Sequence, residues 1–275
     1  MLKLSQASAY FDRTPVLDAY KGSVVCMGQV DPYDESKRDA GAAYRRVLSV
    51  APGTTIPTHG ALRIFDTVWL AGRRERDGLA ELHRDKYVLQ PADGQFGFST
   101  LTQYLAGTTR AQAYVAAEPV KTGKESESSS DVIAFYNLYM APSVAVAKHE
   151  VLWVADQAFL ALSVQVLPSG LKTAYSLKLD HSPVDAVLRT RVFDPVQGRH
   201  TLGASVNTRA ARIRWQNLFE YEGQMEERYQ EGDDTFALPA GSVVDTSSTV
   251  QAYGRTWRVL SVDDLGGAVT VHGRS

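Results

Sequence analysis

The sequence predicts a mainly β protein, built from small β-barrel or sandwich modules with a few short helices and a larger middle insertion. Short runs rich in β-branched and aromatic residues recur along the 275 residues, and glycine and proline turn signals separate them. No long stretch places its apolar residues at helical spacing. Apolar residues make up 44% of the chain, which is enough for a sizeable core, so global disorder is excluded.

The N-terminal part supplies the first β elements. Arg45–Val50 is a β-rich run, and the dipeptide Pro52-Gly53 after it is a turn signal. Ala61–Phe65 and Val68–Leu70 then predict two short strands around a tight polar turn. We therefore expect residues 1–120 to form an N-terminal β-rich domain, which is a possible first barrel module.

One low-complexity segment divides the chain. Residues 121–130 read KTGKESESSS, and such small polar side chains cannot bury apolar surface. This composition predicts a flexible linker or loop. Residues 131–275 are then expected to form a C-terminal β domain, with a barrel at about 190–275.

The second half contains the longest apolar stretch and several further strands. Residues 151–166 are too short to span a bilayer and include Asp156 and Gln157, so we expect them to form buried core. Lys172–Leu179 alternates in character and predicts a half-buried strand, with Ala174 and Ser176 on the lysine-bearing, solvent side. The last strands are expected at 249–253, 257–262 and 268–271.

An internal repetition relates the two ends of the chain. Trp69 and Trp257 lie 188 positions apart, and the same shift aligns five further pairs of similar residues: Gly53 with Gly241, Ile56 with Val244, Thr58 with Thr246, Leu62 with Val250 and Phe65 with Tyr253. Either the chain holds two related barrels separated by an insertion, or both segments share the general pattern of β-hairpins.

The sequence contains no motif for catalysis, cofactor binding or metal binding. There is no G-x-S-x-G motif, and Cys26 lies in an apolar run typical of a buried structural thiol. The six histidines are scattered. Residues 148–150 predict a solvated turn, and the pair Asp233-Asp234 predicts a polar turn. We therefore expect no catalytic residue, no cofactor and no metal. Carboxylates that meet only in space are invisible in one sequence, so an enzyme or ligand-binding protein stays open as an alternative.

Charge is close to balanced overall but separated locally. The net charge is −2, which argues against a general electrostatic nucleic-acid binder. Residues 189–214 hold six arginines and one acid, whereas residues 220–234 hold seven acids and one arginine. One hypothesis is two solvated faces that neutralise each other within one subunit. The other is a head-to-tail subunit interface, and its candidate residues are Arg209, Arg212, Arg214, Glu226, Glu227, Glu231, Asp233 and Asp234.

The last 85 residues or so resemble the small β-barrel head-closure (stopper) and head–tail joining proteins of tailed bacteriophages. In that family a D-P-x-x-G strand-turn leads to a long loop, and the barrel ends with an aromatic-Gly-x-x-aromatic-x-Val hairpin. The segments that match this order are Arg191–Gly198, Tyr221–Gly223, Pro239–Gly241 and Val250–Val259. Members of that family are usually much shorter than this chain, and the middle segment has no counterpart in them.

The resemblance implies a non-enzymatic virion protein that forms a ring in the head–tail connector, between the portal and the tail. Its expected partners are further copies of itself, portal or adaptor proteins and tail proteins. Packaged DNA would pass through the channel without sequence-specific binding, and no membrane is involved. The expected location is the virion, after synthesis in the host bacterial cytoplasm, since the N-terminus has no signal-peptide pattern. Another virion β protein of the tail, baseplate or capsid decoration is the main alternative.

Overall fold

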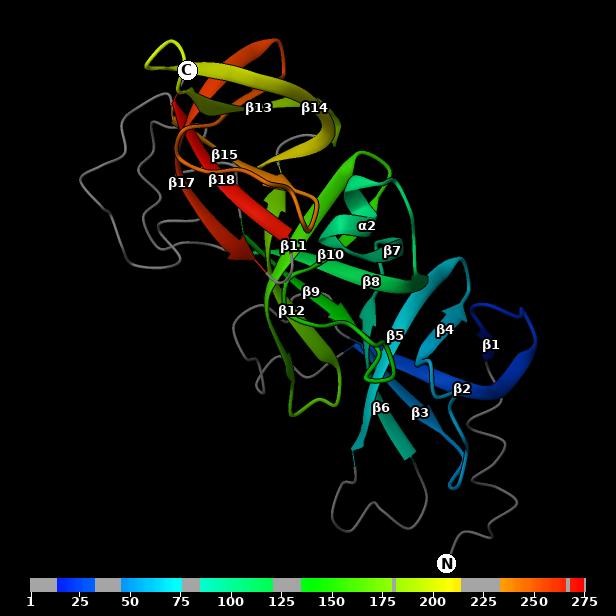
Figure 1. The fold of residues 1–275 in the computed structure, drawn as a ribbon. Helices are drawn as coiled ribbons and strands as arrows, with labels where there is room; N and C mark the ends of the chain where they lie inside the picture. The colour runs from blue at the N-terminus through cyan, green and yellow to red at the C-terminus, as the bar shows by residue number, and fades with distance from the viewer. Residues whose placement is uncertain are drawn as a thin grey trace, which may run out of the picture.

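The computed structural model of the chain describes residues 14–32, 46–75, 85–120, 135–179, 182–213, 233–265 and 268–274. These residues form three closed antiparallel barrels of six strands each, together with one short helix (Figure 1). The predicted mainly β barrel fold is therefore confirmed. The barrels follow one another along the molecule in chain order, with barrel 1 nearest the N-terminus (Figure 1).

The strands divide evenly among the barrels. Barrel 1 contains β1 to β6, at Thr14–Asp18, Val24–Pro32, Arg46–Val50, Ala61–Ile64, Thr67–Glu75 and Asp85–Pro91. Barrel 2 contains β7 to β12, at Gly94–Thr100, Ala111–Pro119, Phe135–Met140, Glu150–Val154, Gln157–Val166 and Lys172–Leu179, and helix α2 at Leu101–Leu105 follows β7. Barrel 3 contains β13 to β18, at Val184–Asp194, Arg199–Ile213, Asp233–Leu238, Thr249–Ala252, Arg255–Leu265 and Ala268–Arg274.

All three barrels have the same topology. In each, the first three strands form one meander and the last three form another. The third strand pairs with the sixth, and the first pairs with the fourth to close the barrel. A β-bulge interrupts the pairing of the fifth strand with the sixth at the equivalent residues Ala71, Ala161 and Val259. Such bulges bend a strand and increase its twist, which helps a small sheet to close.

The 188-residue repetition is structural. Gly53 and Gly241 lie in equivalent turns, and both have a φ of +78°. The hairpin between the fourth and fifth strands turns at Phe65, Ala155 and Tyr253, which all adopt left-handed backbone with φ near +50°. The repeating unit thus occurs a third time, in the middle segment that the sequence left without a counterpart.

The barrel interiors hold different side chains at equivalent positions. Opposite one another on the third and sixth strands stand Leu48 and Tyr87 in barrel 1, and Leu138 and Ala174 in barrel 2. On the fifth strand, Phe159 of barrel 2 stands where barrel 1 has Trp69, and it is only 1% exposed. The core positions are therefore kept while the residues that fill them differ.

The loop from the third to the fourth strand is held by different chemistry in each barrel. In barrel 1, the Asp85 carboxylate accepts a hydrogen bond of 2.8 Å from the Gly53 backbone N–H. In barrel 2, the equivalent residue Lys172 donates to the Val144 carbonyl. In barrel 3, the equivalent Val269 and the loop residue Val244 both pack against the apolar core. The residue at this position binds the loop directly in barrels 1 and 2, and its type differs in all three barrels.

Barrel 2 is buried on two faces because it lies between the other barrels. Its outer face, with Leu177 and helix α2, packs on Ile213 and Ala237 of barrel 3. This arrangement corrects the prediction for β12. The strand forms as expected, but Ala174 and Ser176 are fully buried inside the barrel rather than on a solvent side.

The contact between barrels 1 and 2 is close. Leu70 of barrel 1 packs in one buried cluster with Tyr139 and Leu171 of barrel 2. A β-carbon on Gly72 would lie 2.5 Å from the Ser169 carbonyl oxygen, so only glycine permits this approach. Each junction therefore buries apolar surface, and the three barrels form a continuous packed body.

The expected division of the chain differs from the barrel boundaries. Barrel 1 ends at β6 and barrel 2 begins at Gly94, so the predicted N-terminal domain 1–120 takes in parts of two barrels. The predicted linker 121–130 lies outside the described residues, but β8 before it and β9 after it are paired neighbours in barrel 2. The apolar stretch 151–166 forms β10 and β11 in the core of that barrel.

Candidate functional site

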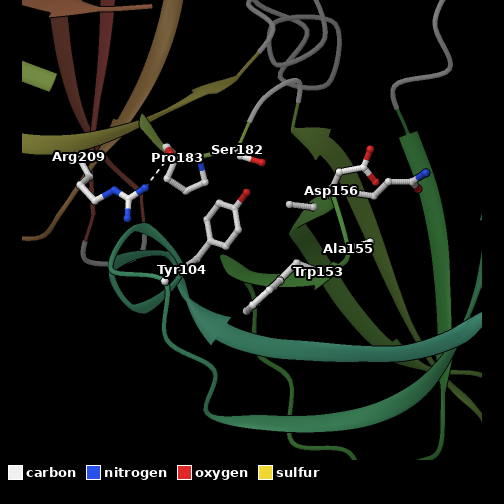
Figure 2. Close-up of a pocket in the computed structure, with 10 residues that line it drawn as sticks. Tyr104, Trp153, Ala155, Asp156, Ser182, Pro183 and Arg209 are labelled. Atoms are coloured by element: carbon white, nitrogen blue, oxygen red, sulfur yellow. Dashed lines mark hydrogen bonds between the residues drawn. The ribbon is translucent and has the colours of Figure 1, made fainter. Parts of the chain in front are cut away.

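In the described part of the chain, clefts open between the barrels and their loops, and two of them are considered for a functional role. The first, of about 160 Å³, lies where barrel 2 meets barrel 3 and is lined by Tyr104, Trp153, Asp156, Ser182, Pro183 and Arg209, among others (Figure 2). The second, of about 410 Å³, lies along the loop at 53–60 and is lined by threonine, glycine and proline residues together with Ile56 and Tyr87.

The first cleft has an aromatic floor and one charge on each side. Figure 2 shows the Tyr104 ring pointing toward Ser182 and Pro183, with Arg209 on one side and Asp156 on the other. The Arg209 guanidinium donates a hydrogen bond of 2.7 Å to the Pro183 carbonyl oxygen. Burial raises the pKa of Tyr104 to about 12, so its hydroxyl stays protonated at neutral pH. The hydrogen bond joins β14 to the residue before β13, within barrel 3, at the side where that barrel meets barrel 2.

The buried carboxylates hold loops and strands in place. In barrel 2, Glu150 is bound by Arg110 at 2.7 Å and accepts a hydrogen bond of 3.0 Å from the Ala147 N–H. This finding corrects the expectation of a solvated turn at 148–150, because Arg110 reaches the loop from a position 40 residues away. An ion pair between residues so far apart in the sequence cannot be predicted from the residues around either of them.

Asp18 has a similar role in barrel 1. Its carboxylate accepts hydrogen bonds from the Tyr20 and Lys21 N–H groups and lies 3.0 Å from His59 Nε2. Burial acts to raise the pKa of Asp18, but these hydrogen bonds outweigh it, so the pKa is lowered overall. The ionised form of Asp18 therefore ties β1 to the loop before β4.

The structure brings two of the predicted interface residues together. Arg212 of β14 and Asp234 of β15 form an ion pair at 2.8 Å within barrel 3, and Asp234 is buried. This pair corrects the expected polar turn at Asp233-Asp234, because both residues begin a strand. The ion pair also agrees with the hypothesis that the arginine-rich segment 189–214 and the acidic segment 220–234 neutralise each other within one subunit.

The structure brings none of the other interface candidates together with an opposite charge from the predicted set within the described residues. Arg209 lies in the first cleft, and its Nε is 3.9 Å from the fully exposed Asp185. The Asp233 backbone belongs to β15, and its side chain is outside the described part of the chain. Arg214, Glu226, Glu227 and Glu231 also lie outside the described residues. The head-to-tail hypothesis for these residues stays a prediction.

Cys26 lies on β2, half-buried, and packs on the core of barrel 1. Burial raises the pKa of its thiol, which disfavours the reactive thiolate. Among the described residues, no group of three or more histidine, cysteine, aspartate or glutamate side chains is positioned to hold a metal ion. No helix within these ranges has the length and apolar character needed to cross a membrane.

The sequence analysis missed an exposed apolar surface on barrel 3. The ribbon of β13 and β14 exposes Val192, Phe193, Val196, Leu202 and Val206, and Val196 at the turn is 93% exposed. These residues belong to long strands whose sequence looks like that of any β-strand. The alternation of residue types therefore could not show that they are exposed.

Comparisons with protein-family models, curated proteins and solved structures give no match.

Proposed function

We propose that the protein is a non-enzymatic structural component of a tailed-phage virion that forms part of the head–tail connector ring between portal and tail. The observation that supports this most is the repetition of one six-stranded barrel three times in a single packed chain. The hairpin on which the family resemblance rests, at 250–259, belongs to barrel 3, and its counterparts occur in barrels 1 and 2.

The chemistry of the buried polar groups favours a structural role. Glu150 and Asp234 are each used in an ion pair that joins strands or loops, and Asp18 is used in the same way through hydrogen bonds. Groups that serve catalysis are normally left accessible to a substrate in a cleft. Here the carboxylates stabilise the barrels themselves, which is the use that a load-transmitting assembly protein requires.

The packing between barrels also supports the proposal. Apolar clusters and a glycine contact at Gly72 join barrel 1 to barrel 2, and helix α2 joins barrel 2 to barrel 3. A subunit of a ring must hold its neighbours at fixed positions, so a chain of barrels that pack against one another suits this task. The second copy, portal or adaptor proteins and tail proteins are the proposed partners, and packaged DNA would pass without sequence-specific binding.

The test is the location of the protein in purified particles. We expect mass spectrometry of virions to detect it in a fixed, low number of copies, and gold-labelled antibody to mark the neck in electron micrographs. Particles that lack the protein should hold DNA-filled heads without attached tails. Labelling at the tail, baseplate or capsid surface would favour the alternative virion role. Absence from particles would overturn the proposal.

A further inference from the structure

The two junctions between barrels are built from equivalent residues. At the first junction, Leu70 on the fifth strand of barrel 1 lies in one buried cluster with Tyr139 on the third strand of barrel 2. At the second, Leu160 of barrel 2 and Ala237 of barrel 3 share a buried cluster, and the strand registers place them at the same two positions. Each barrel therefore docks on the next with a leucine at one fixed position, which we name the docking position. Repeat proteins are built in this way, since each unit contacts only its neighbours.

The third strand, which receives the leucine, is flanked by small side chains. On its outer face it has one neighbour on the second strand and one on the sixth, and we name these three residues the receiving row. The receiving row is Ala116, Tyr139 and Thr173 in barrel 2, and Ala211, Ala237 and Thr270 in barrel 3. The flanking alanines and threonines are at most 4% exposed. Because these side chains are short, the leucine of the preceding barrel can approach the sheet closely.

Barrel 1, at one end of the molecule, has long polar side chains in the same row (Figure 1). Its receiving row is Gln29, Ser49 and Lys86, and among the described residues this row belongs to neither junction cluster. A barrel docked on the row would take the Gln29 amide and the Lys86 ammonium out of water, which is costly for polar groups that gain no new partner. The nearby Asp31 carboxylate already accepts a hydrogen bond of 2.9 Å from the Gln29 amide.

Barrel 3, at the opposite end, has arginines where a leucine would dock. Arg258 stands at the docking position and is exposed. Arg274, which pairs with it, occupies the place of Leu177, a member of the second junction cluster. If two copies of the chain joined end to end with the junction geometry, Arg258 would meet the row that contains Lys86. These two cations would repel each other.

We propose that the receiving row of barrel 1 and the arginine pair of barrel 3 are caps, which end the stack at three barrels and prevent copies of the chain from joining end to end. Terminal units of repeat proteins carry a polar outer face for the same purpose. Without caps, a head-to-tail contact that does not close into a ring would grow into a filament. The inference does not rest on the proposed function, but it requires that any ring contact uses other surfaces.

The test restores the junction residues at each end in a separate variant. The receiving variant, Gln29→Ala/Ser49→Ala/Lys86→Thr, copies the row of barrel 3, and the donor variant, Arg258→Leu/Arg274→Leu, copies barrel 2. Each variant alone should sediment like the wild type. An equimolar mixture should form a complex of two chains, and we expect its association constant to exceed that of the wild type at least about tenfold. A chain with all five substitutions should form filaments in electron micrographs.

Two controls accompany the mixing experiment. Arg199→Leu places a leucine at an exposed position of β14 outside both end faces, and this variant should not bind the receiving variant. If either combined variant fails to fold, the single substitutions Lys86→Thr and Arg258→Leu replace it, and their mixture should still associate more strongly than the wild type.

Three results would overturn the proposal. The first is a mixture that associates no more strongly than the wild type, because the polar residues would then not limit stacking. The second is equal association of each variant alone, which would show unspecific adhesion of apolar surface. The third is wild-type association that Arg258→Leu or Lys86→Thr weakens, because these residues would then be contacts and not caps. None of these results bears on whether the protein lies in the virion neck.

Discussion

Gly273 of β18 lies directly against Trp257 of β17: a β-carbon on Gly273 would stand 2.7 Å from Trp257 Cβ. Trp257 is 1% exposed and fills the interior of barrel 3. We predict that Gly273→Ala lowers the free energy of unfolding by about 1–3 kcal/mol, because the tryptophan must leave its packed position. Thermal unfolding followed by tryptophan fluorescence measures this change.

The matched control for that substitution is Gly94→Ala. Gly94 also lies in a strand, but a β-carbon there meets no atom within 4 Å, and its backbone is not left-handed. Its unfolding free energy should change by less than about 0.5 kcal/mol. Equal losses for the two variants would contradict the packing argument.

Arg212 is predicted to act within its own subunit. Since Asp234 is buried, Arg212→Met leaves a carboxylate without its cation, and we expect a loss of about 2 kcal/mol in unfolding free energy. Urea unfolding measures the loss. Arg258→Met, at an exposed position in the same barrel, should cost far less. The double variant Arg212→Met/Asp234→Asn should recover part of the stability, and a strictly additive result would show that the two side chains do not interact.

This pair limits how the charge blocks can be tested. Reversing the charge of Arg212 would place a second carboxylate beside the buried Asp234 and destabilise barrel 3, so a change in oligomer size would not by itself report an interface. Arg191 of β13 and Arg199 of β14 are free of this problem, since neither forms an ion pair within the described part of the chain. They are the better residues for testing the predicted subunit contact.

The outer modules could be recognised from sequence because their features are local. A turn glycine, a left-handed hairpin residue and a tryptophan lie within 17 positions of one another at Gly53, Phe65 and Trp69, and again at Gly241, Tyr253 and Trp257. Barrels 1 and 3 therefore share their turn residues and a tryptophan at the same spacing, although their other core residues differ.

The middle module could not be recognised, because the same structural positions carry other residues. Ser143 replaces the glycine and Phe159 replaces the tryptophan. Its loop is held by Lys172 in place of an acid. The pairs Arg110–Glu150 and Arg212–Asp234 were equally invisible, because each joins residues more than 20 positions apart. Such contacts follow from barrel closure, which a single sequence does not reveal.

Acid should weaken the tie between β1 and the loop at His59. The pKa of Asp18 is lowered in the folded protein, so its contribution is present above the ordinary value of 3.8 and is lost as the pH falls through the folded pKa. We predict that Asp18→Asn destabilises the protein by about 1–2 kcal/mol at pH 7. The difference from the wild type should shrink below pH 4. Unfolding measured from pH 7 to pH 3 tests this, and a difference that stays constant with pH would contradict it.

The left-handed hairpin residues allow a prediction with the opposite sign. Ala155 has a φ of +50°, which costs an L-residue with a β-carbon about 1 kcal/mol and costs glycine almost nothing. Ala155→Gly should therefore raise the unfolding free energy by about 0.5–1 kcal/mol, even though glycine normally weakens a β structure. The control is Ala111→Gly, in the exposed part of β8, where the backbone is extended and glycine should lower stability. If both variants lose stability, the turn does not store the strain that its geometry implies, and thermal unfolding of the pair decides the question.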